Sequence, residues 1–462
     1  MKRKGLCLFL AMIMVSSAGC SASGAPRQPA DNPVSAAEAT PEAAPEAVSQ
    51  EEKIKLSIAT SLYVEAPHKT ALDGLIEAYK KVKPNVEISV YGSNYDNYWD
   101  NLTVEIMGNN QGDIIQMYPE NIGRYHALQE EGTFMDLTPY FEESPGLKEK
   151  LAGQELCDYD GQTLAISSYA TSVTAMFYRK SLFEKYGVNP DEIHTTEDLR
   201  EAARKLTKDG IYGWSFVIAA HPFAVSEWSR LIARPVSNGL YFKNGEQGPY
   251  TAENINVNSP ENVWAAKWWR DVYAQDKTAK AVNNKKESRE LFWNGNVAMS
   301  MDGSWFVGMT QEQDASLLDD IGVFPSPAVL YNGEEYKANP TMYAVTSLIS
   351  KKCEHPKEAW EFLTWMTSDE AQEIIEASGM IPSNRDYIKS SDYKSRNPMS
   401  YQIYDFGETL YAAQLLADPA IPQQGELQQI MIDAVQEVFA AGENPQDVFD
   451  EAAVQMKEVM EK

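Results

Sequence analysis

The chain alternates between short apolar strands and amphipathic helices. Apolar and polar residues alternate over 53–59 and again over 86–90, which is the period of a β-strand with one buried face. Between these strands, apolar residues recur at helical spacing over 72–82, and Pro84 ends the helix. A third strand is expected at 113–117. This strand–helix–strand order predicts parallel sheets with crossover helices, and therefore an α/β fold.

The same alternation continues along the rest of the chain. Strands are expected at 175–178, 297–301 and 343–346, and helices at 359–366, 427–438 and 449–459. The sequence shows no internal repeat. With 462 residues, the chain is too long for one compact core and suits two lobes behind a processed leader.

The first twenty residues have the pattern of an export signal. A basic start precedes an apolar run over 6–15 that is too short to span a bilayer, and small residues then lead to Cys20. This ending resembles the bacterial lipobox, which implies a signal peptide over 1–19 and lipid (palmitate) attachment at Cys20. The alternative is an ordinary signal peptide with an incidental cysteine. Residues 20–52 are rich in Ala, Pro, Ser and Glu, and we expect the lipidated cysteine to be followed by a disordered tether.

Charge and cysteine content narrow the possible partners. The formal net charge of −27 would repel nucleic acid and anionic lipid headgroups, so we expect no nucleic-acid partner. No later stretch is apolar for about 18 residues, so the lipid anchor is the only membrane attachment expected. Cys157 and Cys353 either form one disulfide or remain two free thiols.

Several segments carry a resemblance to a known family. They are Gly112–Ile115, Leu128–Leu137, Ala175–Phe183, Phe292–Trp305, Ala344–Ile349, Ala359–Leu363 and Gly379–Pro382. In this order and spacing they resemble the extracellular solute-binding proteins of the family that includes maltose-binding protein. Arg179 departs from the pattern, because the family usually has Asn or Asp there.

The resemblance implies a two-lobed periplasmic-binding-protein fold of type II, with a hinge between the lobes and a ligand cleft at their interface. Lobe one would comprise residues 53–173 and 326–380, and lobe two residues 174–325 and 381–462. Ligands of open α/β sheets bind at the C-terminal ends of the strands, so the cleft is expected there.

The resemblance also implies a function. The chain would be the lipoprotein receptor of an ABC importer, anchored on the outer face of the cell membrane. It would capture a carbohydrate by hinge closure as a monomer and deliver it to the permease subunits. The sequence has no phosphate-binding loop, metal-ligand cluster or nucleophile elbow, so we expect no enzyme activity, cofactor or metal. The alternatives are a same-fold receptor for a polyamine, glycerophosphate or peptide, a secreted glycoside hydrolase, and an adhesive lipoprotein.

A sugar has a C–H face that packs on aromatic rings and a rim of hydroxyls that need donors and acceptors. We therefore expect aromatic and polar side chains on loops that follow strands. The candidates in lobe one are Tyr63, Glu65 and Tyr95, with Glu120 and Asn121 added from the resemblance. The candidates in lobe two are Phe223 or Trp228 for stacking, Trp305, Asp302 and Arg385.

Trp305 is the strongest of these candidates, because it lies in a Gly-flanked turn after a strand and in the segment that matches the family best. The alternative for Trp305 is a core position, and the alternative for Arg385 is a solvated surface charge. His221 stands where the family often has an acid. The maltose binder has a further aromatic where this chain has the polar run Gln424–Gln428, which predicts a different or smaller ligand than a maltodextrin.

Overall fold

The computed structural model describes residues 52–462, except 244, 247, 341, 413–415 and 417. The expected signal peptide over 1–19, Cys20 and all but the last residue of the expected tether over 20–52 lie outside the described residues. Within the part that is described, none of the helices combines the length and apolarity needed to cross a bilayer.

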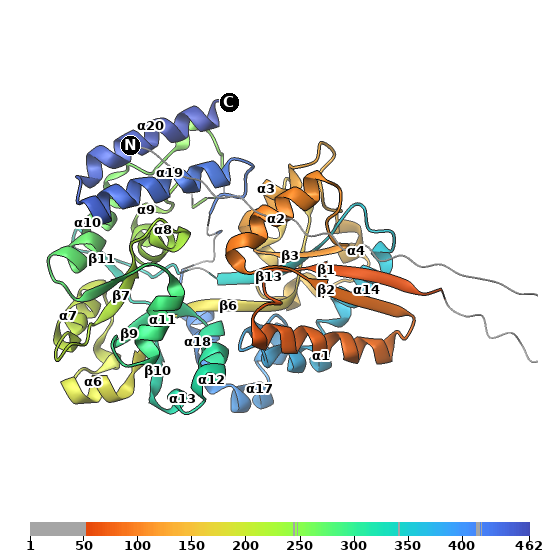
Figure 1. The fold of residues 1–462 in the computed structure, drawn as a ribbon, viewed down its shortest axis with the longest axis horizontal. Helices are drawn as coiled ribbons and strands as arrows, with labels where there is room; N and C mark the ends of the chain where they lie inside the picture. Colours follow the sequence, from red (N-terminus) through yellow and green to blue (C-terminus); the bar gives the residue numbers. More distant parts are fainter. Residues whose placement is uncertain (1–51, 244, 247, 341, 413–415, 417) are drawn as a thin grey trace, which may run out of the picture. The chain divides into compact units, whose positions relative to one another are not determined.

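The first core is built on a mixed sheet (Figure 1). Strand β1 (Ile54–Ala59) lies between β2 (Val86–Tyr91) and β3 (Ile114–Met117) and runs parallel to both. Strand β13 (Met342–Ile349) then pairs with β3 in the antiparallel direction. The alternation in β2 places Val86 and Ile88 inside and Glu87 and Ser89 towards solvent, as a strand with one buried face requires.

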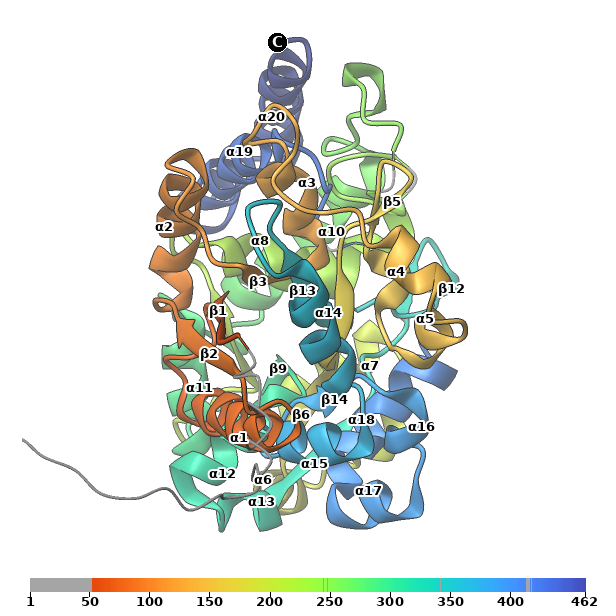
Figure 2. The ribbon, with the colours of Figure 1, turned by 90° about the vertical axis from the view of Figure 1, so that its right-hand side faces the viewer.

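Three of the helices that cover this sheet share one apolar core. Helix α1 (Ala66–Val82) buries the stripe that contains Leu72, Leu75 and Tyr79, and it packs beside α15 (Asp369–Glu376) (Figure 2). Helix α14 (Pro356–Trp365) packs on β13 and contributes Phe362 and Leu363 to the same core. The four predicted strands and both predicted helices of this core are therefore confirmed.

Strand β6 (Ile166–Arg179) belongs to both cores. Its pairing partner changes from β13 at Val173 to β9 (Met299–Gly303) at Thr174, and its last residues pair with β10 (Ile321–Phe324). The sequence predicted only 175–178 of this strand. The missing half is buried on both faces and rich in Ser and Thr, so it shows neither an apolar run nor an alternation.

The second core surrounds a parallel pair, β7 (Trp214–Val217) and β8 (Ala279–Val282). The helices that pack around it are α7 (Thr196–Leu206), α8 (Pro222–Trp228), α10 (Pro260–Ala274), α19 (Gln424–Gln436) and α20 (Pro445–Met460) (Figure 1). Helix α7 begins with a capping box, in which the Thr195 side chain and the Asp198 carboxylate each bind the other residue's backbone N–H. The stretch around Val329 also packs in this core, and Ala328 bridges Thr195, although the expected boundary assigned 326–380 to lobe one.

Arg179 forms hydrogen bonds within the fold, and the two cysteines are buried as free thiols. The Arg179 guanidinium donates to the Asp320 carboxylate at 2.7 Å and to the Phe292 carbonyl at 2.8 Å, so the departure from the family pattern joins β6 to neighbouring segments. Cys157 and Cys353 are both buried and both free, which answers the question that the sequence left open in favour of two thiols.

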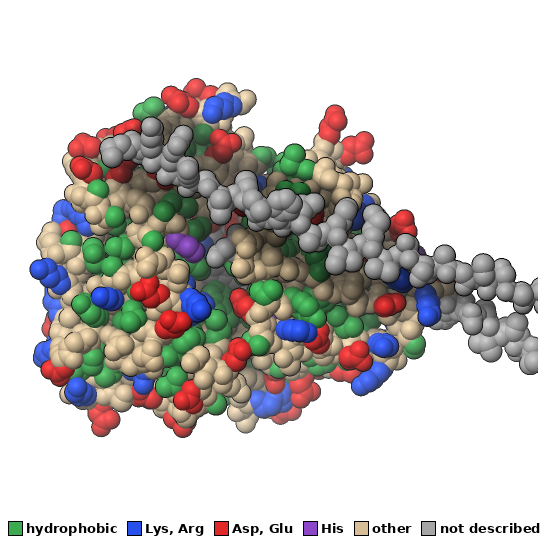
Figure 3. Space-filling model, viewed as in Figure 1, with side chains coloured by type: hydrophobic (Ala, Val, Ile, Leu, Met, Phe, Trp, Pro, Cys, Tyr) green, Lys and Arg blue, Asp and Glu red, His purple; other side chains and the backbone are tan. Residues whose placement is uncertain are grey.

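The charged residues form a mixed surface. Figure 3 shows acidic side chains scattered over the visible face, with basic side chains between them. The net charge of −27 is therefore spread over a solvated surface on this face rather than gathered in one block.

Candidate functional site

A small, solvent-open cavity lies at the end of the second core that is nearest to the crossing of β6. Side chains from β6, α8, the turn after α8, α11 (Lys285–Trp293), β9 and α12 (Trp305–Asp314) line it. They are Thr174, Phe223, Ser226, Glu227, Arg230, Lys285, Met301, Asp302, Gly303 and Trp305.

Two aromatic rings form the apolar wall of the cavity. Trp305 begins α12 two residues after Gly303, and its indole lies so close over Gly303 that a Cβ there would be 2.3 Å from the ring. Glycine is therefore required at 303 to seat the indole. Phe223 lies near the start of α8, where its backbone N–H donates to the Nδ1 of His221 at 3.1 Å and its ring stacks on the His221 ring at 5.3 Å. In this chain, His221 serves as the N-cap of α8.

A buried ion pair lies at the polar side of the cavity. The Lys285 Nζ donates to the Glu227 carboxylate at 2.9 Å and to the Met301 carbonyl at 2.6 Å. The second oxygen of Glu227 accepts the Val217 N–H at 3.0 Å. Both side chains are less than a tenth exposed, so they hold α8, α11 and β9 together beneath the site.

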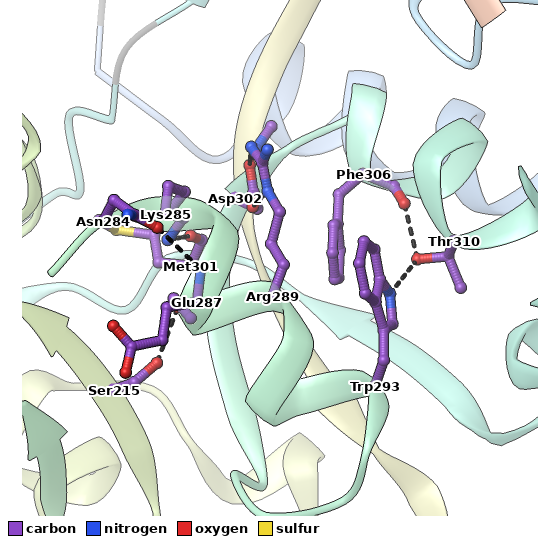
Figure 4. Close-up of polar contacts among 12 residues, drawn as sticks. Ser215, Asn284, Lys285, Glu287, Arg289, Trp293, Met301, Asp302, Phe306 and Thr310 are labelled. Carbon is purple, nitrogen blue, oxygen red and sulfur yellow. Dashed lines mark hydrogen bonds and ion pairs between the residues drawn. The ribbon is translucent and has the colours of Figure 1, made fainter. Parts of the chain in front are cut away.

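A second ion pair lies beside the first. The Arg289 guanidinium donates to both oxygens of Asp302, at 2.8 and 3.0 Å, and Asp302 also accepts the Gly303 N–H at 2.9 Å. Figure 4 shows Arg289 and Lys285 on the same helix, α11, with the Arg289 guanidinium reaching Asp302. Burial opposes ionisation of Asp302, but Arg289 and Lys285 outweigh it and hold its pKa below the usual range.

Carboxylates of the first core face this side of the second core. Burial raises the pKa of Glu65, at the N-terminus of α1, while the positive charge of Arg289 opposes that rise. Burial also raises the pKa of Glu120 to about 7, the negative charge of Asp418 adds to the rise, and Arg230 opposes it. Arg230 itself pairs with Asp418 at 3.9 Å. Glu65 and Glu120 are thus electrostatically coupled to residues of the second core.

The remaining candidates of the first core are Tyr95, Tyr63 and Asn121. Tyr95 is 38% exposed at the start of α2 (Tyr95–Met107), and its ring packs edge-on against Trp99 at 5.7 Å and tilted against Tyr118 at 6.4 Å. The Tyr63 hydroxyl donates to Asp73 at 2.8 Å, within a local cluster with Lys69. Asn121 is partly buried at the end of a short 3₁₀ turn that also carries Glu120.

None of the five lobe-one candidates lines the cavity, and two lobe-two candidates also lie away from it. Trp228 is fully buried in the second core, where its ring packs against Phe439 at 6.2 Å and Phe449 at 5.9 Å. Five residues along a helix turn a side chain by about 140°, so α8 directs Phe223 to the cavity and Trp228 to the core. Of the two alternatives for stacking, the structure therefore places only Phe223 at the site.

Arg385 is the second of these candidates. Its guanidinium pairs with Glu408 at 2.9 Å and with Glu155 at 3.4 Å, and it is not among the residues that line the cavity. The expectation that Arg385 reaches the cleft is therefore corrected in favour of a surface ion-pair cluster. Its partners are distant in the sequence, so nothing in the local pattern could have shown them.

Sequence reasoning missed seven residues that line the cavity: Thr174, Ser226, Glu227, Arg230, Lys285, Met301 and Gly303. Lys285 and Arg289 are four residues apart, which on a helix places them on one face, but charged pairs at this spacing are common on solvated helices. Their burial depends on partners from α8 and β9, which become neighbours only in the fold.

The described residues contain no group of three or more His, Cys, Asp or Glu side chains that could hold a metal ion. What the cavity offers is an aromatic wall, hydroxyls and paired charges. Such a surface can bind a small polar ring, since apolar faces and a few fixed polar groups are typical of small-molecule sites.

Comparisons with known proteins agree with this architecture. The sequence profile described as bacterial extracellular solute-binding protein matches residues 65–373. A maltotriose-binding protein of Pyrococcus abyssi is 25% identical over 373 residues, which cover 79% of this chain and 73% of that protein. The sn-glycerol-3-phosphate-binding periplasmic protein of Salmonella typhimurium is 24% identical over 409 residues, which cover 82% and 87%.

A solved structure gives the same picture of the fold. An ABC transporter solute-binding protein from Thermotoga lettingae, bound with α-D-tagatose, superposes with a TM-score of 0.71 at 18% identity, covering 88% of this chain and all of that one. The predicted mixed α/β periplasmic-binding-protein fold is therefore confirmed.

Proposed function

Because this chain belongs to the bacterial extracellular solute-binding protein family, we propose that its cavity captures a carbohydrate for uptake by an ABC importer. The chain is a solute-binding protein of an ABC transporter, acts outside the cytoplasm and is not an enzyme. The carbohydrate ligand is our finer assignment. It is consistent with relatives such as the maltotriose-binding protein and with the tagatose-bound structure.

The observation that carries the proposal is that aromatic rings and hydroxyl groups line the same cavity. Trp305 and Phe223 offer flat apolar faces, while Thr174 and Ser226 supply hydroxyl groups. A pyranose or furanose ring needs both, because its C–H face packs on an aromatic ring and its hydroxyls require partners once they leave water.

Closure of the two lobes completes the proposed mechanism. A ligand seated on lobe two would receive further contacts from lobe-one groups such as Glu65, Tyr95 and Glu120. Only the closed state makes both sets of contacts, so ligand would shift the population towards closure. We propose β6 as one of the crossings about which the lobes move, since it is shared by both cores. The permease would then recognise the closed form of a monomer.

We also propose that Cys20 anchors the chain to the membrane by lipid. The support is the pattern of a basic start, an apolar run and small residues before Cys20. Growth of the expressing cells with radiolabelled palmitate should label the wild type and leave a Cys20→Ala variant unlabelled. Equal labelling of both proteins, or no labelling of the wild type, would contradict the anchor and leave the receptor function intact.

A thermal-shift screen tests the function. The purified protein would be heated with mono- and oligosaccharides, polyamines, amino acids and glycerophosphates in separate wells. A ligand that binds only the folded state raises the melting temperature by mass action, by an amount that corresponds to about 2.7 kcal/mol at a hundred times its Kd. A shift restricted to related sugars is the expected result. A shift from a polyamine or glycerophosphate, with no response to sugars, would contradict the carbohydrate assignment.

A further inference from the structure

We propose that the cavity selects uncharged carbohydrates and rejects their anionic derivatives, because the cations at and beside its surface are already paired with carboxylates of the same lobe. This inference rests on the proposed function and narrows its substrate class. The family profile does not decide the point, since relatives include both a maltotriose-binding and a glycerol-3-phosphate-binding protein.

Lys285 is the first of these cations. Its Nζ has two acceptors inside the protein, the Glu227 carboxylate and the Met301 carbonyl, and only 8% of the side chain is exposed. Glu227 is in turn fixed by the Val217 N–H. A phosphate or carboxylate could recruit Lys285 only by leaving Glu227 as an unpaired buried charge, which is strongly unfavourable.

Arg289 is the second. Its guanidinium makes two parallel hydrogen bonds to Asp302, the geometry in which Arg binds a carboxylate most strongly. Asp302 is nearly inaccessible and is also held by the Gly303 N–H. An anionic ligand would therefore compete with an internal carboxylate that already occupies the best donors of Arg289.

Arg230 is the third cation, and carboxylates of both lobes interact with it. It pairs with Asp418 at 3.9 Å, and it interacts electrostatically with Glu120 of the other lobe. The three cations Lys285, Arg289 and Arg230 thus face three carboxylates of their own lobe. Lobe one brings two further carboxylates near this group, Glu65 and Glu120.

The pKa values of the two lobe-one carboxylates indicate that a further negative charge is unfavourable at this site. Burial, with help from neighbouring carboxylates, raises the pKa of both Glu65 and Glu120, so each is harder to ionise here than in water. A second anion placed between them would meet the same desolvation and repulsion. A hydroxyl changes no charge and can bind at the remaining lone pairs and at Thr174 and Ser226.

The test uses matched ligands on the purified full chain. Isothermal titration calorimetry would compare neutral sugars with derivatives that carry a negative charge at different ring positions: glucose and galactose, alone and as disaccharides, against their uronates and their 1- and 6-phosphates. We expect each anionic form to bind at least about 100-fold more weakly than its neutral parent, because its charge stays unpaired. An anionic form that binds as tightly as its parent would overturn this inference and leave the receptor function standing. Silence towards every sugar in both sets would overturn both.

A charge variant tests whether electrostatics causes this selectivity. Glu65→Gln removes a partly exposed lobe-one carboxylate opposite Arg289, and Glu87→Gln makes the same change on the solvent face of β2. We would compare the Kd of each anionic derivative, divided by the Kd of its neutral parent, between the proteins. For at least one derivative, Glu65→Gln should lower this ratio by about tenfold. Glu87→Gln should leave the ratio unchanged. Equal ratios in wild type and Glu65→Gln for the whole set, or an equal change in Glu87→Gln, would refute the electrostatic explanation.

Discussion

Trp305 and Trp228 provide a direct test of which aromatic side chains bind ligand. Trp305 lines the cavity and packs against the first core, whereas Trp228 is fully buried in the second core between Phe439 and Phe449. Replacement of Trp305 by Ala should weaken binding with a moderate effect on stability. Replacement of Trp228 by Ala should do the reverse.

The size of the two effects follows from burial. A sugar face that covers roughly 80 Å² of the indole, about half of what a Trp buries in full, contributes about 2 kcal/mol at ~25 cal/mol per Å². Loss of this contact corresponds to about a 30-fold rise in Kd. Loss of the Trp228 side chain from a packed core should lower the free energy of unfolding by roughly 3–5 kcal/mol. In Trp228→Ala molecules that remain folded, Kd should stay within about twofold of wild type.

Calorimetric titration with the sugar that gives the largest thermal shift measures Kd, and urea unfolding followed by circular dichroism measures stability. Both variants would be titrated well below their melting temperatures, so that unfolding does not mimic weak binding. The reasoning is refuted if Trp305→Ala binds within about threefold of wild type. It is also refuted if Trp228→Ala weakens binding as much as Trp305→Ala does.

Three further predictions concern buried charges and thiols. Since the pKa of Glu120 is raised to about 7 in the folded state, the folded protein binds more protons than the unfolded chain between about pH 4.5 and 7, and stability falls as pH rises through this window. Glu120→Gln should remove up to about 3 kcal/mol of this fall in urea titrations at pH 5 and pH 8, and an unchanged difference between the two pH values would contradict the assignment. Lys285→Met should lower the free energy of unfolding by roughly 3–5 kcal/mol by leaving Glu227 unpaired, and Lys285→Met/Glu227→Gln should recover part of that loss; a double variant less stable than the single one would argue against the buried pair. Cys157 and Cys353 should be silent to a thiol reagent in the native protein and both react in denaturant without reductant, whereas two unreactive thiols in denaturant would indicate a disulfide.

Much of the first core could be predicted from the sequence because its pattern is local. The strand over 86–90 has one solvated face, so apolar and polar residues alternate, and α1 has one buried stripe at helical spacing. Strand β6, in contrast, could be predicted only in part from the local pattern. Its first half carries Ser167, Ser168 and Thr171 in fully buried positions, because neighbouring strands and helices enclose both of its faces. A buried polar strand has no periodic signal of its own.

The residues of the site also differ in whether a local sequence pattern could predict them. Trp305 and Asp302 could be predicted, because a Gly-flanked turn after a strand is a local feature and lies at the cavity. Lys285 and Glu227 could not, because each is buried only by virtue of the other, 58 residues away. Phe223 and Trp228 share one short helix, and the sequence alone left open which of them faces the ligand. Arg385 lies in an ion-pair cluster whose partners are equally distant.

The central claim is that a sugar binds in the cavity of the second core, and an experimental structure of the protein with its bound sugar tests it most directly. We predict a sugar ring packed against Trp305 and Phe223, with hydroxyls towards Thr174 and Ser226 and with lobe-one side chains such as Glu65 closing over it. The ion pairs Lys285–Glu227 and Arg289–Asp302 should remain intact. A sugar bound elsewhere on the chain, or one that breaks either ion pair to reach its cation, would contradict the account.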